Sequence, residues 1–141
     1  EESTARITPV LEAAMAEGGP PLHLLRRVLV RTLEYVELDE DFRAITELVT
    51  FQTEAVPELA EGMQRKIAAN RQLMDFVAQT IQQGLDSGEV RAGVDPHSAA
   101  ITLLAVLNGA IMLWLLDQDL VSLKRQASAI VDNCLDGLAA P

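Results

Sequence analysis

The sequence predicts an all-helical domain, and three observations support this fold class. Runs of β-branched and aromatic side chains, which favour strands, are scarce, and aromatic residues make up only 4% of the chain. Apolar residues recur at three- and four-residue spacing along most of the 141 residues. Gly and Pro interrupt that spacing where helices would begin and end. We therefore expect one domain, residues 1–141, of about six helices.

The first half of the chain contains the signals for three helices. Thr8-Pro9 suits a helix start, and Gly18-Gly19 suits a helix end. Pro20-Pro21 then precedes a second, amphipathic helix. The acidic run at 39–41 favours the positive end of a third helix dipole. The apolar face of this third helix would consist of Phe42, Ile45, Leu48 and Val49.

The second half contains the signals for three more helices. After Pro57, apolar residues follow at steps of three or four, which predicts one amphipathic helix of about 45 Å. Asp95-Pro96 is a strong start signal for a helix to about Leu116. Either Asp119 or Ser122 would open the last helix. The stripe of the long helix runs through Leu59, Met63, Ile67, Asn70, Met74, Val77, Ile81 and Leu85.

Residues 98–116 form an uncharged run of 19 residues, for which three explanations compete. The run is long enough for a membrane span, but its flanks are acidic and Asn108-Gly109 interrupts it, so no membrane is expected. A thick core within one chain is the second explanation. We favour the third, a homodimer in which a second subunit covers the far face of this helix and part of the last one.

The last helix carries two adjoining apolar stripes, and which of them faces the partner stays open. On the uncharged helix, we expect the partner on the side away from Leu104, Leu107 and Ile111. The residues assigned to the dimer interface are Leu103, Val106, Ala110, Leu113, Ala127, Val131, Cys134 and Leu138.

Charge and missing motifs exclude several functions. A formal net charge of −10 opposes binding of DNA or anionic membrane by this part of the protein. Cys134 is the only cysteine, so no intramolecular disulfide can form, and a cytoplasmic location fits. His23 and His97 follow prolines at helix starts and should be exposed. Because no metal-ligand, nucleophile or phosphate-loop motif occurs, we expect no enzyme, no metal and no cofactor.

Polar residues set into apolar faces point to a ligand cavity. Asn70 interrupts the stripe of the long helix, and Asn108 lies within the uncharged one. Thr46 and Thr50 lie one turn apart on the third helix, and Thr32 lies on the apolar face of the second. For any single residue, a hydrogen bond to a neighbouring helix is a sufficient explanation. Several of them facing one interior are better explained by an apolar cavity with a few polar groups.

Several motifs occur in a fixed order along the chain. They are Pro21-Leu22 with Leu25-Arg26, then 42–48, then Gly88-Glu89-Val90 with Asp95-Pro96-His97-Ser98-Ala99-Ala100, then Asn108-Gly109 with Leu113-Trp114-Leu115, and a closing 131–138. Over residues 20–138 this order resembles the C-terminal domain of TetR/AcrR-type transcriptional repressors, and within them the multidrug-efflux, MAATS-type subgroup.

The resemblance implies an effector-sensing domain whose binding of a small amphipathic molecule releases operator DNA, in the control of an efflux or detoxification operon. It implies dimerisation through the last two helices as a four-helix bundle. It also implies an N-terminal helix-turn-helix head, outside these residues, that 3–17 would connect to the domain. A stand-alone helical scaffold protein without a pocket is the alternative. The ligand-binding positions that the resemblance implies are Leu25, Val28, Leu29, Thr32, Thr46, Thr50, Lys66, Asn70, Leu73, Val77, Leu104, Leu107, Asn108 and Ile111.

The expected lining favours neutral or weakly acidic ligands. It holds neutral polar groups and no carboxylate, so a cationic drug would lose hydration without gaining a partner. The subgroup often has Asp where this chain has Asn108, and Asn108→Asp is expected to shift preference toward cations. Two orientations of Lys66 stay open: toward the pocket, or along the helix with its amine in water.

Overall fold

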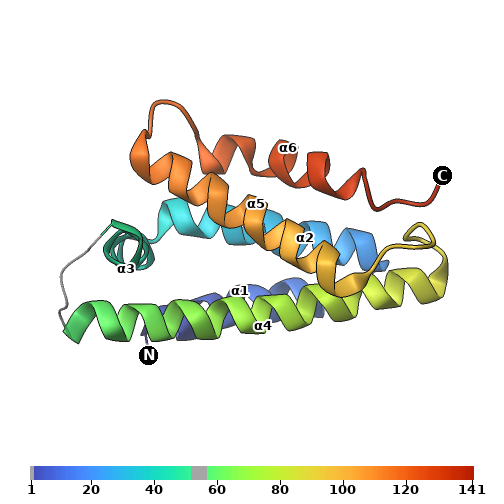
Figure 1. Cartoon of the computed structure of the whole chain (residues 1–141), viewed down its shortest axis with the longest axis horizontal. Coiled ribbons are helices and arrows are strands. Elements are labelled where there is room, and N and C mark those ends of the chain that lie inside the picture. The colour runs from blue at the N-terminus through green and yellow to red at the C-terminus, as the bar shows by residue number, and fades with distance from the viewer. Residues whose placement is uncertain (1, 52–56) are drawn as a thin grey trace.

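The computed structural model describes the backbone of residues 2–51 and 57–141, and the side chains of these residues except 2–7, 42, 45, 49 and 50. Within this part the chain folds as a bundle of six helices (Figure 1). The all-helical prediction is therefore confirmed. The helices are α1 (Glu2–Ala16), α2 (Pro21–Leu38), α3 (Glu40–Phe51), α4 (Pro57–Ser87), α5 (Pro96–Leu116) and α6 (Leu123–Leu135).

The helices form layers around α2. In Figure 1, α5 runs diagonally in front of α2 and meets α4 near its own first turns, while α6 lies on the side of the bundle opposite α4. α1 packs against both α2 and α4, while α3 runs across one end of the bundle and contacts α4 and α2. Because α2 packs against every other helix, its apolar stripe is enclosed. The stripe residues Leu25, Val28, Leu29, Leu33 and Val36 are each 0% exposed.

Two helix starts use the caps that the sequence predicted. Asp95 accepts a hydrogen bond from the Ser98 backbone N–H at 2.9 Å, and Pro96 occupies the first position of α5. For α6 the structure decides between the two candidates, because the Ser122 hydroxyl accepts from the Arg125 N–H at 3.3 Å. These side-chain acceptors pair backbone donors that helix geometry leaves unpaired.

The predicted start of the first helix is wrong. α1 already begins at Glu2 and contains Pro9, where the sequence indicated a start at Thr8-Pro9. A proline within a helix removes one backbone hydrogen bond and crowds the preceding turn. The packing of α1 against α2 and α4 supports the helix despite this cost.

Charged side chains of α2 join it to its neighbours. Arg26 pairs with Asp132 of α6 at 2.7 Å, and this guanidinium lowers the pKa of the Asp132 carboxyl. Arg27 donates to the carbonyl oxygens of Ala14 and Gly18, at 3.0 and 2.8 Å, and so caps the end of α1. Exposed pairs add little stability, but together they fix how α1 and α6 lie on α2.

α5 is covered by the chain on one side only. It is the one described helix long and apolar enough to cross a membrane by length and composition, with a mean hydropathy of 2.2 in its most apolar window. Only 28% of that window is buried. Leu104, Leu107 and Ile111 face the interior, as expected. The exposed side presents Ile101 (50%), Met112 (44%), Leu113 (46%) and Leu116 (63%).

Four side chains that the sequence assigned to a partner are buried within the chain itself. Leu103, Ala110, Ala127 and Val131 are at most 9% exposed. The reason is that α5 packs against α2 and α6 as well as α4, so its buried face is wider than one stripe. The exposed face is consequently rotated by about one residue from the predicted one. Of the other assigned residues, Leu113 is exposed, and Val106, Cys134 and Leu138 are half-buried.

The end of α4 packs closely on the loop that follows it. Val90 is buried, and its backbone N–H donates to the Gly84 carbonyl oxygen at 3.0 Å. A Cβ atom at Gly84 would lie 2.4 Å from Val90 Cγ2, far inside van der Waals contact. Glycine is therefore required at this position by the approach of a side chain, since the backbone there is helical.

We predict that Gly84→Ala destabilises the fold by about 1–2 kcal/mol, because overpacking outweighs the better helix propensity of alanine. Denaturant unfolding measures the change. In a Val90→Ala background the clash is absent, so adding Gly84→Ala should there be neutral or stabilising. Equal destabilisation in both backgrounds would show that this contact is not the cause.

Candidate ligand-binding site

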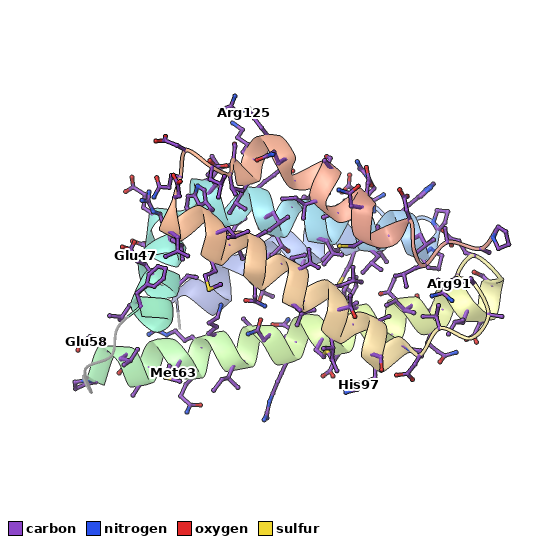
Figure 2. The ribbon with its side chains drawn as sticks, turned by 45° about the horizontal axis from the view of Figure 1, so that its top comes forward. Glu47, Glu58, Met63, Arg91, His97 and Arg125 are labelled. Carbon is purple, nitrogen blue, oxygen red and sulfur yellow. The ribbon has the colours of Figure 1, made fainter. Side chains whose placement is uncertain are left out.

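The inward face of α4 changes character along the helix. In its second half this face is apolar, and Val77 and Ile81 are fully buried. In its first half the apolar side chains Met63 and Ile67 are instead 45% and 42% exposed, although the sequence placed them on the continuous stripe (Met63 is labelled in Figure 2). The side chain that turns inward here is Lys66.

Lys66, Asn108 and Asn70 form a hydrogen-bonded chain between α4 and α5. The Lys66 Nζ donates to Asn108 Oδ1 at 3.0 Å. Because an ammonium can only donate, this contact fixes the orientation of the Asn108 amide. Its Nδ2 then donates to the Leu104 carbonyl oxygen at 2.9 Å and, more weakly, to Asn70 Oδ1 at 3.5 Å. The structure thus brings together three of the predicted ligand-binding residues.

The charge on Lys66 has no counter-ion in the described part of the chain. Partial burial lowers the pKa of its amine, since the charged form loses hydration. Among the described residues no carboxylate forms an ion pair with it, although the chain has 21 acidic residues. Of the two orientations that the sequence left open, the half-buried amine lies toward α5 and bonds Asn108, while its role in a ligand pocket stays a prediction. Its single partner among the described side chains is a neutral amide.

Asn108 has no hydrogen-bonding hydrogen left for a ligand. Both hydrogens of its Nδ2 are donated within the protein, and its oxygen accepts from Lys66. The sequence treated Asn108 as the ligand's polar contact. In the structure its amide bonds Lys66, Asn70 and Leu104, and contact with a ligand stays a prediction. Two donors of the ammonium stay available, and the Asn70 Nδ2 has no acceptor in the described part of the chain.

The other predicted ligand-binding residues lie on α2, α3, α4 and α5, and those with a described side chain are buried, as a shared interior requires. Thr32 donates to the Val28 carbonyl oxygen of its own helix at 2.8 Å, so its hydroxyl is already satisfied. Thr46 is 5% exposed. The side chain of Thr50 lies outside the described residues. Leu25, Val28, Leu29, Leu73, Val77, Leu104, Leu107 and Ile111 are each at most 9% exposed.

Sequence reasoning missed one contact next to this region. The Arg43 guanidinium lies 5.1 Å from the ring centroid of Trp114, which joins α3 to α5. Arg43 precedes Thr46 by three residues, and Trp114 follows Ile111 by three, so the stack lies one turn from predicted ligand positions on both helices. Periodicity assigns each residue to a face but does not pair faces across helices.

Two surface hollows lie away from the polar chain. One, of about 350 Å³, is formed by the loop before α5, the first turns of α5 and the end of the chain, and includes Arg91 and Cys134. Figure 2 shows Arg91 at the end of the bundle opposite Glu47 and Glu58. The other, of about 480 Å³, follows the outer side of α2. Neither is lined by a predicted ligand-binding residue.

Comparison with known proteins connects this arrangement to transcriptional regulators. The chain is 27% identical over 118 residues to the HTH-type transcriptional regulator AcrR of Shigella flexneri, covering 84% of this chain and 55% of AcrR. It is 26% identical over 118 residues to the HTH-type transcriptional regulator TtgR of Pseudomonas putida, covering 84% of this chain and 56% of TtgR. The chain thus spans a little over half the length of these relatives.

The fold is shared with a solved repressor of a multidrug efflux pump. The complex of SmeT, from Stenotrophomonas maltophilia, with triclosan superimposes with a TM-score of 0.77 at 24% identity, covering 99% of this chain and 67% of SmeT. The family model of the C-terminal region of MAATS-type transcriptional repressors matches residues 20–140. The chain therefore belongs to the MAATS-type family of transcriptional repressors, of which it forms the C-terminal region.

Proposed function

We propose that this chain is the effector-sensing and dimerisation domain of a transcriptional repressor that controls an efflux or detoxification operon. The observation that carries the proposal is the polar chain Lys66–Asn108–Asn70 between α4 and α5. Apolar side chains at these positions would give a more stable fold. Family membership also supports the proposal. A scaffold protein, the alternative, would not require a lysine between two core helices that pairs with no described carboxylate. No catalytic step is proposed, and the protein would act in the cytoplasm.

The route from effector to DNA would pass through α1. This helix packs against α2, α3 and α4, three of the four helices that carry the predicted ligand positions. Its far end is held by Arg27 and by Glu17, which pairs with Arg31 at 2.5 Å. A ligand that spreads these helices would therefore turn α1 about a fixed end. The population would shift away from the arrangement that binds DNA.

Operator binding would reside in an N-terminal helix-turn-helix head joined to α1. The relatives AcrR and TtgR are HTH-type regulators nearly twice as long as the matched segment. The net charge of −10 makes the present residues a poor surface for a phosphate backbone. The head would supply the basic reading surface, and this domain would set the spacing of two heads.

A second copy of this chain would cover the exposed face of α5. Ile101, Met112 and Leu116 are exposed apolar side chains on a helix that carries no charge. Gly109 lies among them, and a Cβ added there would meet nothing within 4 Å in the chain. Glycine costs about 1 kcal/mol relative to alanine within a helix, so close approach of a partner helix would account for it. On α6, Ile130 and Cys134 are half-buried and would join this face.

We predict that the isolated chain binds no operator DNA, because its charge repels phosphate and the reading head is absent. Joining it to its natural upstream segment should produce sequence-specific binding that weakens steeply with salt. Gel shifts with and without that segment test this. A shift of operator DNA by the isolated chain would contradict the proposed division of labour.

We predict that triclosan, the ligand of the SmeT complex, raises the melting temperature of this chain by about 5 °C near saturation. Asn108→Leu should need about tenfold more triclosan for the same rise in melting temperature, because Lys66 loses the amide that orients it. Gln72→Leu, an exposed change on α4, is the matched control. If neither triclosan nor any other amphipathic compound stabilises the wild type, the effector-sensing role is wrong.

We predict a two-fold dimer that buries on the order of 2,000 Å² or more through α5 and α6. Met112→Glu should make the chain monomeric at about micromolar concentration, because two-fold symmetry buries the introduced charge twice. Met63→Glu on α4 is the control and should leave the dimer intact, because Met63 is 45% exposed, like Met112 at 44%, but lies outside the interface. Sedimentation measures all three proteins, and a strictly monomeric wild type would refute the interface.

A further inference from the structure

We propose that the effector is an amphipathic carboxylic acid, bound as its anion with its head on the Lys66 ammonium and the Asn70 amide. This inference rests on the proposed effector-binding function and names the chemical class of the ligand. It goes beyond the neutral or weakly acidic preference that composition suggested. Three features of the described residues lead to it: position, charge and hydrogen-bonding capacity.

The first feature is the inward position of Lys66. Two apolar residues, Met63 and Ile67, lie within one turn of it on α4 and are 45% and 42% exposed. A small rotation of α4 would bury either of them and release the lysine to water. The fold keeps the opposite arrangement, with Lys66 bonded to α5 at 3.0 Å and the apolar side chains outside. If this position only had to fill space, an inward Ile67 would serve better than an inward lysine.

The second feature is the missing counter-ion. A partly buried ammonium that has lost hydration gains most from an anion, and a neutral amide compensates only part of that loss. The chain contains 21 acidic residues against 11 basic ones, yet no described carboxylate pairs with Lys66. The basic residues nearer the surface show the contrast, because Arg26 and Arg31 each hold a carboxylate. A bound carboxylate would complete the same pairing at Lys66.

The third feature is the set of hydrogen-bond donors that Lys66 and Asn70 leave free. Lys66 has two N–H groups left, and the Asn70 Nδ2 has no described acceptor. Asn108 holds both groups in place by bonding Lys66 through its oxygen and Asn70 through its nitrogen. Donors four residues apart on one helix face suit the two oxygens of one carboxylate. A neutral hydroxyl would leave the charge uncompensated, and a cationic head would be repelled.

The apolar part of the ligand would lie beside the polar chain. Leu73 follows Asn70 by one turn on α4, and Leu104 and Ile111 flank Asn108 on α5. These three side chains are 7–9% exposed, whereas Val77 is fully buried. An alkyl tail there would add apolar contact and exclude the remaining water around the head.

The same geometry reverses the expectation for Asn108→Asp. An aspartate would place a carboxylate within hydrogen-bond distance of the Lys66 ammonium, in place of the amide oxygen. The introduced charge would pair with Lys66 and neutralise the site, so no preference for cations should follow. Its effect on acid binding should instead resemble the loss of Lys66.

The test measures binding of three matched probes, decanoate, decanol and decyltrimethylammonium, by isothermal titration calorimetry. The wild type should bind decanoate at least about tenfold more tightly than either other probe. Lys66→Met, which keeps the volume, and Asn108→Asp should abolish this advantage while decanol binding persists. Lys66→Arg should retain it. Arg65→Met, on the same helix turn, is the control that removes a cation paired with Glu61 instead.

Stability separates recognition from a structural role. Without ligand, Lys66→Met should melt about 2–5 °C higher than the wild type, because it removes a partly buried charge that has no described counter-ion. A lower melting temperature would mean that Lys66 supports the fold, and would overturn the proposal.

The remaining outcomes distinguish this proposal from the proposed function. Equal binding of decanoate and decanol by the wild type, or an unchanged decanoate advantage in Lys66→Met, would overturn the acid specificity while effector binding stands. If no decyl probe binds, both ideas fail. If decanoate binds as described but does not release operator DNA from the full-length protein, the repressor mechanism fails and the acid site stands.

Discussion

The structure depends on one constraint, that a helix without charged residues must be covered on every side. α5 has a mean hydropathy of 2.2 in its most apolar window, and α2, α4 and α6 bury only 28% of that window. The five other helices surround α2, but the chain has no further described helix to surround α5 as well. The side turned toward α2 and α4 becomes the core, and the side with Met112 and Leu116 stays exposed. In the proposed dimer a second chain would cover that side, so fold and assembly would follow from the same helix.

The covered side of α5 is also where the interior departs from good packing. A stable core would place apolar residues where α4 meets the middle of α5, yet the first half of α4 brings Lys66 and Asn70 to Asn108 there. Such arrangements cost stability and are found where function requires them. Here the cost is limited by Asn108, whose amide oxygen accepts from Lys66 and whose nitrogen donates to Asn70. A ligand that supplies negative charge would offset that cost. The charge on Lys66 would then both lower the stability of the free protein and raise its affinity for the ligand.

Communication with DNA would use α1, whose end is held on α2 by polar contacts. α1 is held on α2 by hydrogen bonds from Arg27 to Ala14 and Gly18, and by the pairing of Glu17 with Arg31. These contacts lie at the end of α1, whereas its length packs against α2, α3 and α4. A helix fixed at one end and packed against a ligand-bearing interior can amplify a small displacement along its length. The dimer would keep the other reference point, α6, tied to α2 through Arg26 and Asp132.

The sequence by itself determined the helices, because periodicity and caps act over a few residues, as at Asp95 and Ser122. It also placed Leu104, Leu107 and Ile111 inside, since helix geometry fixes which residues share a face. It could not place the start of α1, where packing outweighs the local signal of Pro9. Nor could it fix the rotation of α5 or the direction of Lys66, because both depend on how wide a face the other helices cover. Only the tertiary structure showed that Lys66 donates a hydrogen bond to Asn108, since this pairing joins residues 42 positions apart.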